Sequence, residues 1–244
     1  MSKSDLEFFA FSKRKISPLL EKAFSVKKKA TKINVLDLGC GEGAMLEALA
    51  RRGLLDDTNI TAIDISPRLI SIAKKRFKKR AQFIKTDVVK TNLPKSRFDL
   101  VYSTMVIEHI ENPKEMVSEI YRILKPQGVV FISTIVKKWW GIYFYRNKGK
   151  FVVDPTHLHE FESPEELVEL MKDGGFEVIE QITFPRYYSL LELLIKLLIR
   201  LNIISPGDEV RRVFSRKKIL SLIRDRVLFP APGFYEIQIV CIKR

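Results

Sequence analysis

The glycine-rich turn at residues 39–43, with a glycine at every second position, constrains the fold of this chain more than any other stretch. The apolar residues 33–38 before it predict a buried strand, and residues 44–52 after it predict a helix that ends at Gly53. Glycine allows a sharp turn and lets a ligand approach bare backbone, beside the unpaired N–H groups of a helix N-terminus. Such a turn at the carboxyl end of a parallel strand predicts a cofactor site.

Strand and helix patterns alternate along the rest of the chain. Helices are expected to begin where a capping residue precedes proline, at Ser66-Pro67, Asn112-Pro113 and Ser163-Pro164. This alternation predicts right-handed crossovers and a parallel sheet covered on both faces, with an antiparallel pair late in the chain where no crossover intervenes. The predicted strands cover residues 33–38, 59–65, 82–86, 98–103, 129–135, 176–184 and 234–242.

The glycines alone do not choose the cofactor, because Gly39, Gly41 and Ala44 also satisfy the loose dinucleotide pattern. Asp37, two residues before Gly39, favours a different ligand. A carboxylate at this position faces a cationic group more readily than a pyrophosphate. A sulfonium cofactor with an amino-acid tail carries that positive charge.

The phrase at residues 35–43, Val-Leu-Asp-Leu-Gly-Cys-Gly-Glu-Gly, resembles the first motif of the class I S-adenosylmethionine-dependent methyltransferases. Glu108-His109 before Asn112-Pro113 resembles the small-molecule and quinone-biosynthesis (type 11) branch of that family. The resemblance runs from about residue 33 to the C-terminus. It implies an α/β fold with a Rossmann-like, doubly wound, seven-stranded sheet, mostly parallel with an antiparallel last strand. It also implies S-adenosylmethionine as the cofactor.

Acidic residues at successive strand ends extend the cofactor site. Asp64 closes the second predicted strand, where a carboxylate can accept both ribose hydroxyls. In the resembled family, the acid at Asp87 accepts the adenine amino group. Taken singly, Asp64 as a helix cap and Asp87 as a turn residue are the plain alternatives. The predicted cofactor-binding residues are Asp37, Gly39, Cys40, Gly41, Gly43, Asp64, Ile65, Asp87, Val88, Ser103 and Thr104.

Three histidines are candidate catalytic bases for an acidic proton of the acceptor: His109, His157 and His159. An equally plain alternative is that they fix loops by hydrogen bonding. Some O-methyltransferases of the resembled branch hold a divalent metal with Glu-x-x-Glu-His, but Met105 stands here in place of the first acid. No metal site is therefore predicted.

The balance of charge allows an anionic partner without requiring one. The 244 residues include 43 Lys and Arg against 29 Asp and Glu, a net charge of +14. This favours nucleic acid, phospholipid headgroups or a phosphorylated substrate, or else only a solvated basic surface. An Asp-Pro-Pro-Tyr type tetrapeptide, typical of amino-methylating nucleic-acid enzymes, is missing after the fourth strand, so nucleic acid is the weaker expectation. Two cysteines and no signal-peptide pattern predict a cytoplasmic protein.

Two inserts depart from a minimal domain: an aromatic-rich one at 137–161 and a late one at 186–233. Residues 187–204 predict a helix with one narrow charged stripe, and basic residues follow. The range 187–218 can therefore contact a membrane peripherally, or form a buried lid or dimer interface. The predicted organisation is a helical cap (1–32), the core (33–185), a helical insert or lid (186–233) and the last core strand (234–244).

We therefore expect an S-adenosylmethionine-dependent methyltransferase acting on a small molecule, one that can be lipid-like or isoprenoid-like. Two alternatives remain open: an RNA methyltransferase that uses the basic surface, and a cofactor-binding subunit without turnover.

Overall fold

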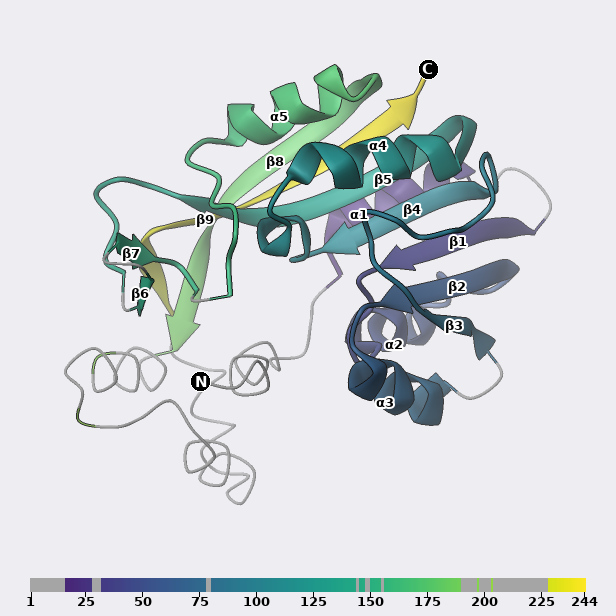
Figure 1. Cartoon of the computed structure of the whole chain (residues 1–244), viewed down its shortest axis with the longest axis horizontal. Helices are drawn as coiled ribbons and strands as arrows, with labels where there is room; N and C mark the ends of the chain where they lie inside the picture. Colours follow the sequence, from purple (N-terminus) through teal and green to yellow (C-terminus); the bar gives the residue numbers. More distant parts are fainter. Residues whose placement is uncertain are drawn as a thin grey trace.

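A computed structural model of the chain describes residues 16–27, 32–77, 80–143, 145–147, 150–154, 156–189, 197, 203 and 228–244. Seven strands form one sheet in the order β3-β2-β1-β4-β5-β9-β8 (Figure 1). The strands are β1 (Ile33–Leu38), β2 (Thr58–Asp64), β3 (Gln82–Lys85), β4 (Phe98–Thr104), β5 (Leu124–Lys137), β8 (Phe176–Ser189) and β9 (Leu228–Lys243). A small hairpin of β6 (Tyr145–Asn147) and β7 (Lys150–Val152) lies apart from this sheet.

The direction of the strands confirms the predicted fold class. The pairs β3-β2, β2-β1, β1-β4 and β4-β5 are parallel, whereas β9 runs antiparallel to both of its neighbours, β5 and β8. Parallel strands end at the same edge of a sheet, so the loops after β1, β2, β3, β4 and β5 all lie along one carboxyl edge.

Helices cover both faces of the sheet, as predicted. One face packs against α4 (Pro113–Ile123) and α5 (Pro164–Asp173), and buried Leu36, Val101 and Ile239 belong to this core. The opposite face, called the α1 face below, packs against α1 (Pro18–Lys27), α2 (Ala44–Arg51) and α3 (Pro67–Phe77). Side chains of a strand point alternately to the two faces, which is why neighbouring residues belong to different cores.

The helix starts follow the predicted capping chemistry at two of three sites. The Ser163 hydroxyl accepts from the Glu166 N–H at 3.3 Å, and the Ser66 hydroxyl accepts from the Leu69 N–H at 3.4 Å. Asn112 does not cap α4 with its side chain. Its amide instead donates to the Glu115 carboxylate at 3.0 Å.

Strands β8 and β9 are longer than predicted and extend into the range 186–233. Tyr187, Tyr188 and Ser189 pair with residues 230, 229 and 228, so the helix prediction is wrong for 187–189. The cause is the antiparallel partner, since backbone pairing along β9 keeps these residues extended. Apart from residues 197 and 203, the rest of 190–227 lies outside the described residues, as do residues 1–15 and 28–31 of the predicted cap. Among the described residues, no helix is long and apolar enough to cross a membrane.

Candidate functional site

The glycine turn joins β1 to α2 at the carboxyl edge of the sheet. The N–H groups of Gly39 and Cys40 both donate to the Ile63 carbonyl, at 2.9 and 2.8 Å, which fixes the turn against β2. Gly39, Gly41 and Gly43 have φ of 84°, 53° and 80°, the left-handed region that favours glycine. A Cβ on Gly39 would lie 2.4 Å from Val106, whereas one on Gly41 would meet nothing within 4 Å. Gly39 is therefore required by packing, and Gly41 borders open space where a ligand can approach the backbone.

Asp64 at the end of β2 is oriented by two backbone donors. Its carboxylate accepts from the N–H groups of Gly41 and Ser66, both at 2.8 Å. Each carboxylate oxygen has two lone pairs, so both oxygens retain capacity for a ligand hydroxyl. Ile65 beside it is 60% exposed, an apolar surface next to polar acceptors that suits a base and its ribose.

The other predicted residues at this edge differ in what their side chains contact. Asp87 accepts from the Val89 N–H at 3.1 Å, and Val88 between them is buried. The buried Ser103 hydroxyl donates to the Leu38 carbonyl at 2.8 Å, so its side chain joins β4 to β1. Ser103 therefore has a structural bond that sequence pattern did not predict, while its neighbour Thr104 is only half-buried.

Asp37 lies inside the sheet with 2% exposure. Burial raises the pKa of Tyr102 well above its ordinary value, and the adjacent Asp37 carboxylate raises it further. Burial likewise raises the pKa of the Cys40 thiol, with added contributions from Asp37 and Asp64, so this thiol is neutral. A carboxyl group at the end of β1 suits a cationic ligand group better than an anionic one.

These residues fit the cofactor that the sequence predicts. The open approach at Gly41, the oriented carboxylate of Asp64 and the buried carboxyl group of Asp37 match a ligand with a ribose and a sulfonium. A pyrophosphate in the same place would face Asp37 instead of a counter-charge.

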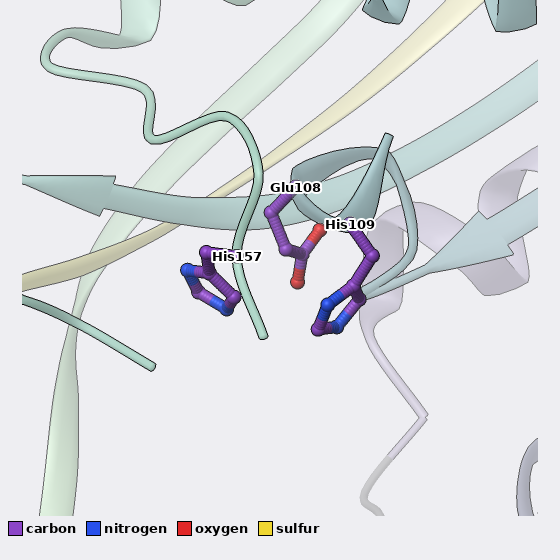
Figure 2. A group of neighbouring side chains, drawn as sticks. All are labelled: Glu108, His109 and His157. Carbon is purple, nitrogen blue, oxygen red and sulfur yellow. The ribbon is translucent and has the colours of Figure 1, made fainter. Parts of the chain in front are cut away.

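A second group of side chains lies at the end of β4 (Figure 2). Glu108 and His109 come from the short 3-10 helix η3 (Ile107–His109), and His157 comes from the segment before α5. Glu108 is 2% exposed, and its carboxylate accepts from the Thr134 hydroxyl at 2.8 Å. Its backbone carbonyl accepts from the N–H groups that follow His157, at 3.0 and 3.1 Å, which ties the two segments together.

The surroundings of His109 define which ring nitrogen carries a proton. Its Nδ1 lies 3.2 Å from the Thr156 carbonyl, which can only accept, so Nδ1 is the donor. The Thr156 hydroxyl, also 3.2 Å away, donates to Asp154 at 2.7 Å and therefore accepts from Nδ1 too. In the neutral ring this leaves the lone pair on Nε2, the form that can take a proton from an acceptor.

His157 has the opposite electrostatic character. Burial by itself would lower the pKa of His157, but its interaction with Glu160 and the charges of Glu108 and Asp154 outweigh this and raise it. The Nδ1–Oε1 distance to Glu160 is 3.7 Å, and Lys137 also pairs with Glu160 at 2.9 Å. His157 is therefore suited to hold positive charge beside a developing anion. The rings of His157 and His109 lie 5.1 Å apart, edge to face.

His159 is not part of this group. Its Nε2 pairs with Glu166 at the start of α5 at 2.8 Å, and its ring packs on Phe161. Of the three predicted histidines, the structure thus brings together His109 and His157.

Glu108, His109 and His157 each offer one ligand atom, and these atoms all lie within 4.8 Å of one another. One carboxylate oxygen and two imidazole nitrogens are a donor set that divalent metals accept. Sequence spacing could not predict this trio, because its third member lies on a distant segment. The Glu-x-x-Glu-His spacing that Met105 interrupts would have marked only the first two.

Comparisons with known proteins agree on one family. Residues 8–181 match the family described as the methyltransferase domain. The ubiquinone biosynthesis O-methyltransferase of Coxiella burnetii is 29% identical over 180 residues, which cover 70% of this chain and 73% of that enzyme. The enzyme with the same description from Rickettsia canadensis is 30% identical over 171 residues, covering 66% of this chain and 70% of its own length.

A solved structure shares the fold. The phosphoethanolamine N-methyltransferase 2 of Haemonchus contortus, in complex with S-adenosyl-L-methionine, aligns with a TM-score of 0.61 at 20% identity. The alignment covers 98% of this chain and 56% of that chain. At this identity the likeness shows the fold alone.

Proposed function

The chain belongs to the methyltransferase domain family, and from that premise we propose that it methylates a hydroxyl group on a small aromatic acceptor with an isoprenoid or other apolar tail. The resemblance predicted from residues 35–43 is confirmed, and the chain is an S-adenosylmethionine-dependent methyltransferase of the small-molecule class. The finer choice of a quinone-like acceptor is supported by the relatives described as ubiquinone biosynthesis O-methyltransferases.

Asp37, Gly41 and Asp64 form the cofactor half of the site, which binds and orients the cofactor. S-adenosylmethionine, when bound, supplies a methyl group that its sulfonium already activates. We assign ribose binding to the Asp64 carboxylate, because two backbone N–H groups already fix its direction. We assign the approach of the cofactor backbone to Gly41, and electrostatic attraction of its positive charge to Asp37.

The observation that carries the proposed acceptor chemistry is the pairing of His109 and His157 around Glu108 (Figure 2). His109 Nε2 is the base that takes the proton of the acceptor hydroxyl, since Nδ1 is held as a donor. His157, whose pKa is raised, stabilises the negative charge that forms on the oxygen. Holding a base beside the reacting hydroxyl contributes about 10²–10⁴ in rate.

The test uses 4-prenylcatechol with S-adenosylmethionine and measures the methylated product by mass spectrometry. We expect transfer to a ring hydroxyl and a fall in kcat of about 10²–10⁴ in His109→Gln, with unchanged cofactor affinity. Glu177→Gln, on a carboxylate paired with Arg244 at the other edge of the sheet, is the matched control. Full activity of His109→Gln, or no transfer to any hydroxyl by the native enzyme, would contradict the proposal.

We also propose peripheral membrane contact through residues 187–218, on the cytoplasmic side. An acceptor with an isoprenoid tail resides in a bilayer, and the net charge of +14 favours anionic lipid. Most of this range lies outside the described residues. The proposal is therefore supported by the sequence pattern of the range alone. Co-sedimentation with phosphatidylglycerol vesicles should exceed that with neutral vesicles and fall at high salt. Equal binding to both would contradict it.

A further inference from the structure

The turn at residues 138–142, which follows β5, exposes apolar side chains that are normally buried. Trp139 is 92% exposed, and its neighbours Trp140 and Ile142 are 49% and 46% exposed. An indole in this position leaves most of its large apolar area in water. Exposed apolar residues that lie together on a folded domain mark a site of contact with a partner or a membrane.

The backbone of this turn is fixed to β9. The Lys138 N–H donates to the Gly233 carbonyl at 3.0 Å. The Ile142 N–H donates to the carbonyl of Pro232 at 3.1 Å. Gly233 has φ of 81°, and a Cβ on it would lie 2.1 Å from the Gly141 Cα, so the two backbones are in close contact. The exposed side chains are therefore held on a fixed piece of backbone.

The sequence around the turn is basic as well as aromatic. Residues 137–153, called the aromatic arm below, contain no Asp or Glu. Their basic residues are Lys137, Lys138, Arg146, Lys148 and Lys150. Tryptophan with neighbouring Lys and Arg is typical of a surface that rests on anionic lipid headgroups. Nucleic acid would also attract the positive charge, but it binds flat rings by stacking, and the aliphatic Ile142 gains more from a hydrocarbon environment.

The aromatic arm begins beside the acceptor half of the site. Lys137 pairs with Glu160 at 2.9 Å, and Glu160 Oε1 lies 3.7 Å from His157 Nδ1. His157 belongs to the pair proposed to act on the acceptor. The exposed turn is thus connected to that pair through the Lys137 and Glu160 side chains, on the side of the molecule where the proposed acceptor is received.

We infer that the turn at residues 138–142 is a membrane anchor, with the Trp139 and Ile142 side chains entering the interface of an anionic bilayer. The inference rests on the proposed function, because an acceptor that resides in a bilayer gives the contact its use. It differs from the contact proposed for residues 187–218 in its residues and in its driving force. Burial of apolar side chains persists at high salt, whereas attraction between basic residues and headgroups is screened.

Fluorescence tests the anchor directly, because Trp139 and Trp140 are the two tryptophans of the chain. Trp140→Phe leaves Trp139 as the fluorophore, and Trp139→Phe leaves Trp140. The vesicles contain phosphatidylglycerol and a phosphatidylcholine brominated on its acyl chains. Emission from Trp139 should shift to shorter wavelength and fall about twofold on vesicle binding. Trp140, whose ring packs edge to face on Tyr235 at 6.5 Å, should be quenched less. Vesicle binding without quenching of Trp139 overturns the inference and leaves the contact through 187–218 in place.

A matched pair of variants tests the contribution of apolar burial. Ile179 is 42% exposed, close to Ile142, but lies near the start of β8, at the opposite end of that strand from residues 187–189. At high salt, Ile142→Ala should weaken co-sedimentation with phosphatidylglycerol vesicles about fivefold and Trp139→Ala about tenfold, whereas Ile179→Ala should bind like native protein. Equal binding by all three variants overturns the inference. Quenching of Trp139 by an RNA oligonucleotide but not by vesicles overturns it too.

The anchor and the proposed function can fail separately. Quenching of Trp139 by vesicles in a protein that methylates no hydroxyl would overturn the proposed function and leave the anchor in place. Methylation of 4-prenylcatechol by a protein whose Trp139 emission does not respond to vesicles would overturn the anchor alone.

Discussion

The two halves of the carboxyl edge are built differently. In the cofactor half, each predicted residue lies at or near the carboxyl end of its own strand, and Asp64 accepts from Gly41 on the neighbouring turn at 2.8 Å. In the acceptor half, Glu108 and His109 come from η3 and His157 comes from a segment almost fifty residues later. The proposed cofactor site thus depends on local strand–turn–helix geometry, whereas the proposed acceptor site depends on the packing of segments that are remote in sequence. The structure of the cofactor half can therefore stay the same while substitutions change the acceptor half.

The largest effect is expected from Gly39→Ala. Its φ of 84° and the 2.4 Å approach of a Cβ to Val106 should lower the free energy of unfolding by roughly 2–5 kcal/mol, measured by urea titration. Gly41→Ala is the matched variant, with open space around it. It should lose only about 1–2 kcal/mol of stability but weaken cofactor binding about tenfold. Equal effects of both variants would show that the two glycines do not differ in role.

The hydrogen bonds of Glu119 connect the two halves. Glu119 on α4 accepts from the Thr91 N–H at 2.9 Å and from Arg122, and so joins the acceptor half to the loop after β3. Burial alone would raise the pKa of Glu119, but these bonds outweigh it and lower the pKa to about 2.

A folded-state pKa below the ordinary value adds stability above pH 4.5, and that stability is lost as the pH falls from about 4.5 towards 2. The contribution is about 3 kcal/mol. Unfolding measured across this pH range should show the loss in native protein and a flatter profile in Glu119→Gln. Parallel profiles would rule out this bond network as the cause.

The hydrogen bond from Thr134 to Glu108 belongs to the acceptor half. Thr134→Val removes the 2.8 Å donor to the buried Glu108 carboxylate and should cost about 1.5–3 kcal/mol of stability. We expect kcat to fall about tenfold while the Kd for S-adenosylmethionine, measured by calorimetry, changes less than twofold. A matching loss of cofactor affinity would mean that the halves are coupled.

The smallest effects should be equal in the two halves. Ser66→Ala and Ser163→Ala each remove a side-chain acceptor at the start of a helix, α3 and α5 respectively. Each should lower the free energy of unfolding by about 1 kcal/mol, read from chemical denaturation. A much larger cost for Ser163→Ala would indicate that α5 also holds the Glu166–His159 pair in place.

The cofactor half could be predicted from sequence because its signals are local. Gly39, Asp64 and Asp87 each stand at the end of a strand with an apolar pattern, so position along the chain fixes position at the sheet edge. The fold class followed from the same alternation. The structural hydrogen bond of Ser103 in this half was not predicted, because it depends on which backbone carbonyl lies opposite the side chain.

The acceptor half could be predicted only in part. His109 and His157 were candidates by residue type, but the roles of base and cation proposed for them rest on Thr156 and Glu160, which only folding places beside them.

The position of β9 between β5 and β8 also affects how the protein is made. The ribosome synthesises β8 before β9, the strand that connects β8 to the sheet. Residues 176–189 can therefore pair only after residues 228–243 have been synthesised. The parallel strands β1 to β5, by contrast, can assemble as they appear. Nascent chains stalled between these two points should therefore expose a strand edge to chaperones, while the half proposed to bind the methyl donor is already complete.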